Sequence, residues 1–135
     1  LSAQPMPARH GEALRSTLAW TQLAQGKTAF ARKTLVEALE KMDKQRWNES
    51  QRLLLLLDLI HASADAPEEE ARWLNEATAL RAAMDPVYRG GRYLLNGDAK
   101  NKEWERPRDQ ARFAAFKRLP GVEEELEAED RRVCK

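Results

Sequence analysis

The stretch AQGKTAFARKTLVEAL, residues 24–39, joins two helical patterns through a single glycine. Apolar residues recur at helical spacing over residues 11–25 and again over residues 28–43, so we expect one helix in each range. Gly26 lies just past the first range, where glycine can adopt the left-handed backbone conformation that lets a chain reverse. The stretch therefore predicts a helical hairpin with its bend at Gly26.

Each helix of this hairpin carries a stripe of residues expected to face the core. In the first helix, the stripe consists of Leu14, Leu18 and Thr21, with Trp20 and Leu23 beside them. In the second helix, it consists of Ala31, Leu35, Ala38, Leu39 and Met42. The small alanines would let a neighbouring helix approach closely.

A second pair of helices is predicted at about residues 45–62 and 67–84. The run LLLLLDLI at residues 53–60 is apolar nearly all round, so we expect it at the centre of the core. It carries Asp58 and is far shorter than the ~20 residues that cross a bilayer, so we expect no transmembrane segment. Pro67, followed by three glutamates, is typical of a first helical turn. The stripe of this helix would be Trp73, Ala77, Leu80 and Met84.

The last third of the chain is less regular. VYRGGRYLL at residues 87–95 fits either a β-hairpin or an irregular link. Helical patterns follow at residues 106–119 and from Gly121 onward. We therefore expect an all-α fold of two stacked antiparallel hairpins within residues 1–86, after an extended lead-in over residues 1–10. Residues 87–135 would form a C-terminal helical extension that packs on the hairpins or reaches a partner.

The first hairpin resembles half of a tetratricopeptide repeat. The matching residues are Leu18, Ala19, Gln25, Gly26, Ala31, Leu35, Ala38 and Leu39. The sequence departs from that family at Asp43, where the repeat usually has proline, and at Arg15 and Gln22, where it has aromatic residues. The resemblance implies a stacked helical scaffold that binds proteins. A four-helix bundle is the alternative, because packed helices reach the same alanine and leucine spacing.

The N-terminal residues also resemble small helical envelope lipoproteins of proteobacteria that bind a sensor kinase. The shared residues are Met6, Pro7, Ala8, Trp20, Gln25 and Gly26. This resemblance implies a periplasmic or envelope-anchored protein whose partner is the periplasmic domain of a sensor kinase. Because the chain starts at Leu1 without an initiator methionine, we also expect that an upstream segment was removed or is not included.

The composition offers little to build a catalytic centre. Lysine and arginine total 23 against 22 acidic residues, so the net charge of +1 gives no global field toward nucleic acid or an acidic membrane. One cysteine, Cys134, and two histidines make a zinc site unexpected. His61 is expected to be a partly buried residue at a helix end. We therefore expect no enzymatic activity, no metal and no cofactor.

Nucleic acid is the main alternative partner, through residues 100–118. The basic residues there are Lys100, Lys102, Arg106, Arg108, Arg112, Lys117 and Arg118. Trp104, Phe113 and Phe116 are interleaved with them and could stack on bases. An acidic block at residues 123–130 could instead fold back on this helix and cancel its charge, and we favour that pairing.

The favoured function is a non-catalytic protein–protein interaction scaffold or adaptor. The expected contact residues combine residue types common in binding hot spots: Tyr88, Arg89, Arg92, Tyr93 and Trp104. The alternative for these aromatic residues is that they seal the end of the bundle. A homodimer through the apolar third helix is also compatible with the sequence.

Overall fold

The computed structural model describes residues 8–42, 49–84 and 107–133, and these form six α-helices. The helices are α1 (Ala8–Ala24), α2 (Thr28–Lys41), α3 (Glu49–Ala62), α4 (Pro67–Ala83), α6 (Pro107–Lys117) and α7 (Val122–Val133). The prediction of an all-α fold is therefore confirmed over the described residues. The predicted β-hairpin or link at residues 87–95 and the boundary between residues 86 and 87 lie outside them.

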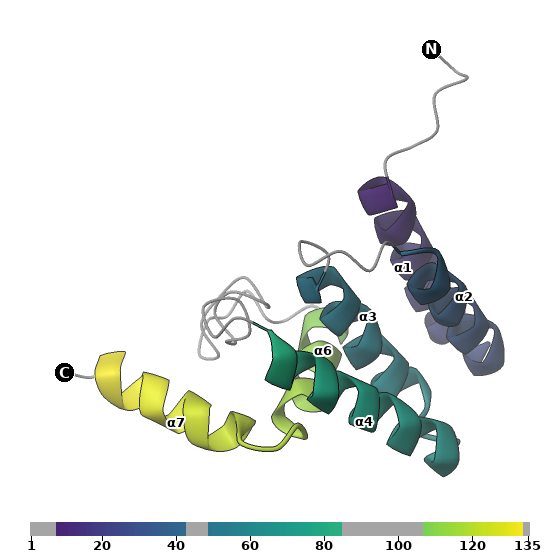
Figure 1. The fold of residues 1–135 in the computed structure, drawn as a ribbon. Helices are drawn as coiled ribbons and strands as arrows, with labels where there is room; N and C mark the ends of the chain where they lie inside the picture. Colours follow the sequence, from purple (N-terminus) through teal and green to yellow (C-terminus); the bar gives the residue numbers. More distant parts are fainter. Residues whose placement is uncertain (1–7, 43–48, 85–106, 134–135) are drawn as a thin grey trace.

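The helices α1 and α2 form the predicted hairpin, and they lie side by side in Figure 1. Gly26 has a φ of 78°, in the left-handed region, and the Lys27 amide donates to the Gln22 carbonyl at 2.8 Å. The helix α1 begins earlier than predicted, because residues 8–10 are helical where we expected an extended lead-in. Pro7 directly precedes this start, a position where proline's fixed φ suits the entry into a helix.

The core-facing side of α1 differs from the prediction. Ser16 and Ala19 are buried, whereas Leu18 and Thr21 are exposed. Trp20 and Leu23 are partly buried, as expected for the edge of the stripe. The physical reason is close packing: α1 presents small side chains to its neighbours, and a leucine at the same point would hold the helices apart.

The predicted stripe of α2 faces the core. Ala31, Leu35, Ala38 and Met42 are buried, and Leu39 is partly buried. The helix ends at Lys41, where the Met42 amide bonds the Leu39 carbonyl. Since three of these residues have no exposed surface at all, α2 is fixed to the rest of the molecule along most of its length.

The helix α3 is the centre of the molecule. Its leucines at residues 53 and 55–57, together with Leu59 and Ile60, are buried. It is covered by α2, α4 and α6, which all pack against it (Figure 1). The prediction that it lies at the centre of the core is confirmed. Most of this apolar surface is buried within one chain, and a homodimer through it stays a prediction.

The helix α4 returns along α3 and completes the second hairpin. Pro67 occupies its first turn with Glu68, Glu69 and Glu70, as predicted from the sequence. Trp73, Ala77 and Met84 are buried, and Leu80 is partly buried. The core-facing side of α4 was therefore predicted correctly.

The two C-terminal helices, α6 and α7, differ in how they contact the rest of the molecule. The helix α6 packs against α3 and contributes buried Phe116 to the core. A turn through Gly121, with a φ of 83°, leads to α7, which begins with buried Val122. Figure 1 shows that α7 then extends away from the other helices. The C-terminal region thus both covers α3 and projects one acidic helix outward.

Candidate functional site

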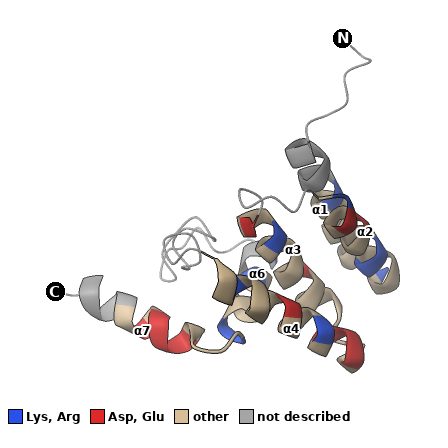
Figure 2. Ribbon diagram, viewed as in Figure 1, with Lys and Arg blue, Asp and Glu red and all other residues tan. Residues whose placement is uncertain are grey.

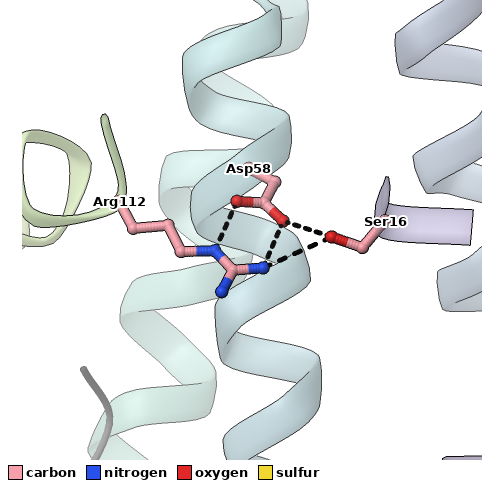
Figure 3. A network of polar contacts seen from close by, with 3 residues as sticks. All are labelled: Ser16, Asp58 and Arg112. Atoms are coloured by element: carbon pink, nitrogen blue, oxygen red, sulfur yellow. Dashed lines mark hydrogen bonds and ion pairs between the residues drawn. The ribbon is translucent and has the colours of Figure 1, made fainter. Parts of the chain in front are cut away.

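A buried carboxylate in the middle of the molecule joins three helices. Asp58 of α3 has no exposed surface, and it binds Arg112 of α6 through both oxygens, with Nε–Oδ1 at 2.7 Å and Nη2–Oδ2 at 2.8 Å. Ser16 of α1 donates its hydroxyl to Oδ2 at 3.3 Å and accepts from Arg112 Nη2 at 3.4 Å. Figure 3 shows Asp58 between the other two side chains. We call Ser16, Asp58 and Arg112 the central polar network.

The local sequence explains how these residues meet. Asp58 interrupts a leucine run whose second half, residues 55–60, is buried, and the Asp58 side chain is itself fully buried. A buried charge is tolerated when it is paired and hydrogen-bonded. The planar guanidinium of Arg112 matches the carboxylate with two parallel hydrogen bonds. The small Ser16 leaves space for this pair on the side of α1.

Chemically, the central polar network is suited to holding helices together. Both carboxylate oxygens of Asp58 accept hydrogen bonds from protein donors, so the group is not positioned as a general base for a bound molecule. Its contribution is to fix α6 in one register on α3 and α1. The network therefore supports the shape of the molecule rather than forming a reaction centre.

Among the described residues, three further groups of ion pairs join separate segments of the chain. Arg32 of α2 donates to Asp65 at 2.6 Å and to the Ala62 carbonyl at 3.0 Å, and it lies 3.4 Å from Glu69. Arg81 of α4 pairs with Glu125 of α7. Asp65 lies in the turn between α3 and α4, and its pair with Arg32 anchors the first hairpin to the second. These contacts connect the first hairpin to the second, and the second hairpin to α7.

The third pair joins Arg118, directly after α6, to Glu70 of α4, and it lowers the pKa of Glu70. Arg118 Nη2 lies 2.9 Å from Glu70 Oε1. The hydrogen bond from Arg118 holds the pKa of Glu70 below its ordinary value, its positive charge adds to the effect, and partial burial of the carboxyl acts in the opposite direction. The ionised form of Glu70 is therefore favoured in the folded protein.

These pairs bear on the predicted charge cancellation in the C-terminal region. Arg112 and Arg118 are bound by acidic residues of α3 and α4, not by the acidic block that follows them. Within that block, Glu125 pairs with α4. We expected the acidic block to pair with the basic helix; in the contacts described, the acids that pair with Arg112 and Arg118 come from the second hairpin instead.

The only large apolar side chains that are markedly exposed among the described residues lie on the first hairpin. Leu18 of α1 exposes 50% of its surface and Phe30 of α2 exposes 62%. Between the helices, Thr34 Oγ1 donates to Gln22 Oε1 at 2.8 Å. Leu18 precedes Gln22 by one helical turn, so the two lie on the same face of α1. Phe30 precedes Thr34 by one turn and lies on the same face of α2 as Thr34. We call Leu18, Gln22, Phe30 and Thr34 the hairpin face.

Two aromatic contacts lie at the join between the hairpins and on α4. The indole of Trp20 stacks on the imidazole of His61 with ring centroids 5.2 Å apart. His61 is exposed, whereas the sequence predicted partial burial. It lies in the last turn of α3, next to Trp20 of α1. Arg72 covers buried Trp73 at 4.4 Å from the ring centroid.

The contact residues predicted from the sequence, Tyr88, Arg89, Arg92, Tyr93 and Trp104, all lie outside the described residues. The prediction about them stays untested. The hairpin face was not identified from the sequence, because Leu18 was assigned to the core and Phe30 has no special motif. The single signal was that Phe30 falls off the buried stripe of its own helix.

Over residues 8–42, 49–84 and 107–133, no cluster of histidine, cysteine and acidic residues has a geometry that could hold a metal ion. Within the same ranges, every helix is too short or too polar to cross a membrane. The chain matches no protein-family model, no curated protein and no solved structure.

Proposed function

We propose that this protein is a non-catalytic scaffold or adaptor that binds another protein through the hairpin face. The observation that carries the proposal is the exposure of Leu18 and Phe30 on one side of a hairpin whose opposite side is buried. A single exposed apolar residue is ordinary on a protein surface. Two large ones that flank the same interhelical hydrogen bond form a patch that water solvates poorly.

The residue types also suit a binding surface. Aromatic side chains are enriched in interface cores, where they lose little conformational entropy and bury much area. Leu35, directly C-terminal to Thr34, is fully buried, so the backbone that carries the hairpin face is anchored in the core. A rigid surface lowers the entropy lost on binding. The hairpin therefore offers an apolar anchor on a preformed support.

The partner class follows from the sequence resemblance, as part of the proposal. Similarity to envelope lipoproteins that bind a sensor kinase favours an envelope protein as partner, such as the periplasmic domain of such a kinase. A periplasmic or envelope-anchored location goes with it. Tyr88, Arg89, Arg92, Tyr93 and Trp104 are proposed as a second contact region.

Nucleic-acid binding has less support than protein binding. Arg112 pairs with Asp58, Arg118 pairs with Glu70, and Lys117 lies 4.8 Å from the ring centroid of Phe113. Releasing these cations for phosphate contacts would break contacts that hold α6. A protein partner at the hairpin face requires no such rearrangement.

The test is a pull-down with the whole chain from lysate and envelope fractions of its own source, followed by mass spectrometry. The bait is compared with Leu18→Ser/Phe30→Ser and with a control, Ala79→Ser/Ala83→Ser, which makes two serine substitutions on the exposed side of α4. One protein should be retained by the parent chain and the control and lost with the first variant.

Circular dichroism of all three proteins checks that helix content is unchanged. Equal capture by the parent chain and the Leu18→Ser/Phe30→Ser variant would contradict the proposal. If Tyr93→Ala/Trp104→Ala alone abolished capture, binding would belong to the second contact region. Enrichment of nucleic acid alone would favour the alternative.

A further inference from the structure

We infer that the hairpin face binds an acidic amphipathic helix, one that carries carboxylates beside a short apolar stripe. This inference rests on the proposed function and names the chemistry of its partner. It is carried by two independent observations: the positions of Leu18 and Phe30, and the distribution of charge over the molecule.

The positions of the apolar anchors fit a helix laid along the hairpin. The helices α1 and α2 run antiparallel, with Gln22 opposite Thr34. Leu18 and Phe30 each lie one turn before these residues in their own helices, so they fall on opposite sides of the Gln22–Thr34 pair along the hairpin axis. The anchors are therefore separated along the hairpin axis by about two helical turns, the spacing of apolar residues two turns apart on a bound helix.

The charge around the anchors is positive. Lys27 and Lys33 are exposed, and each lies three residues from Phe30, on adjacent turns of the same helical surface. Arg15 lies three residues before Leu18 and is partly exposed. The acidic neighbour of this face is Glu37, three residues after Thr34. The immediate surroundings of the anchors therefore have more positive than negative charge.

Two other parts of the described surface have the opposite character. Figure 2 shows acidic positions along α7 and at the first turn of α4. Glu123, Glu124 and Glu127 are exposed on α7. Because the molecule is nearly neutral as a whole, an acidic partner is attracted to the first hairpin and repelled by α7. This asymmetry orients the partner as well as attracting it.

The first experiment selects peptides for binding to the whole chain from a displayed library of helical peptides. The library has one apolar stripe and random charged residues beside it, and it is counter-selected on the Leu18→Ser/Phe30→Ser variant. Enriched peptides should be rich in aspartate and glutamate beside the stripe. Enrichment of basic or uncharged peptides, or no enrichment over the counter-selection, would overturn the inference.

The second experiment measures the affinity of one enriched acidic peptide by fluorescence anisotropy. Lys27→Glu/Lys33→Glu should weaken binding by roughly tenfold at low salt, and the difference should shrink as the ionic strength rises. Lys27→Arg/Lys33→Arg keeps the charge and should retain the affinity. Equal affinities for the lysine-to-glutamate variant and the parent chain would contradict the charge argument.

The same protein is then tested against vesicles of anionic phospholipid and against a single-stranded RNA oligonucleotide. Stronger retention on either than on the acidic peptide would overturn the inference in favour of a membrane or nucleic acid. The outcomes also separate the two proposals. If the pull-down succeeds through Leu18 and Phe30 but the captured protein presents a basic segment, the proposed function stands and this inference fails.

Discussion

The two helical hairpins of this protein differ in what lies on their outer surfaces. In the second hairpin, α3 is covered by α6, and the contact is fixed by the Asp58–Arg112 pair. On the first hairpin, Leu18 and Phe30 remain exposed to solvent in the described part of the chain. Both hairpins bury their inner sides. Among the described helices, α6 packs mainly on the second hairpin.

The difference shows how one polar residue decides which apolar surface is used inside the chain. Leucine-rich α3 could accept an apolar helix in several registers, because hydrophobic contacts are not directional. A bidentate ion pair is directional, so Asp58 selects the helix that carries Arg112 in the correct position. None of the four residues of the hairpin face is a carboxylate, so no pair of this kind selects a helix for that face.

The largest expected effect comes from breaking the pair that joins α6 to the second hairpin. Asp58→Ala leaves the guanidinium of Arg112 without its buried partner, and we expect the free energy of unfolding to fall by about 3–5 kcal/mol. Urea denaturation followed by circular dichroism measures it. The double variant Asp58→Leu/Arg112→Met removes both charges and should recover most of the loss. A loss below about 1 kcal/mol for Asp58→Ala, as for an exposed pair, would contradict this account.

The next largest effect is expected on the buried side of α2, and it is compared with the effect on the exposed side. Leu35→Ala removes a fully buried side chain and should lower the free energy of unfolding by about 2–5 kcal/mol. Phe30→Ala on the exposed side should change it by less than about 0.5 kcal/mol, since the side chain is already in contact with water. Thermal and urea denaturation of the two variants provide the measurement. A large loss for Phe30→Ala would place that side chain in a contact within the protein.

A smaller effect is expected at the two bends that use a left-handed glycine. An added methyl group meets no atom within 4 Å at Gly26 or at Gly121, so only backbone strain opposes alanine at either position. Each substitution should therefore lower the free energy of unfolding by about 1 kcal/mol. Measured side by side, the variants should give similar losses. A much larger loss at Gly26 would mean that the first bend also needs close approach of another group.

The smallest effect concerns the Glu70–Arg118 pair between α4 and α6. The pKa of Glu70 is lowered from 4.5 in the folded protein, so the unfolded chain binds its proton more readily. The stabilisation is therefore present above about pH 4.5 and is lost as the pH falls through the lowered folded pKa. Glu70→Gln should flatten the dependence of Tm on pH in this acidic range. The measurement is a series of thermal scans of both proteins between neutral and acidic pH. If the slope of Tm against pH were the same in both, the Glu70–Arg118 pair would not be the source of the pH dependence.

Much of the fold could be predicted from the sequence because its signals are local. Gly26 and Pro67 mark a bend and a helix start through their own backbone chemistry, and both lie where predicted. The leucine run of α3 predicts central burial without knowledge of its neighbours. Helix starts and ends differ from the prediction by a few residues at most where both are described.

The orientation of α1 could not be predicted in the same way. Hydrophobicity favours Leu18 as the core residue, but the observed core side consists of Ser16 and Ala19. That choice depends on the distance to α2 and on the position of Asp58, neither of which is local. The pairing of Asp58 with Arg112 is likewise not readable from the sequence, because many arginines in the chain could have served. The hairpin face follows from the orientation of α1, so it was missed with it.

The Asp58–Arg112 pair also has a consequence for the order of folding. The two residues are 54 positions apart, whereas the contacts within each hairpin join neighbouring segments. Closing a long loop loses more chain entropy than closing a short one, and short-range contacts form faster. The hairpins should therefore form first and α6 should dock last. Amides of α6 should exchange with deuterium through partial openings that leave α3 protected.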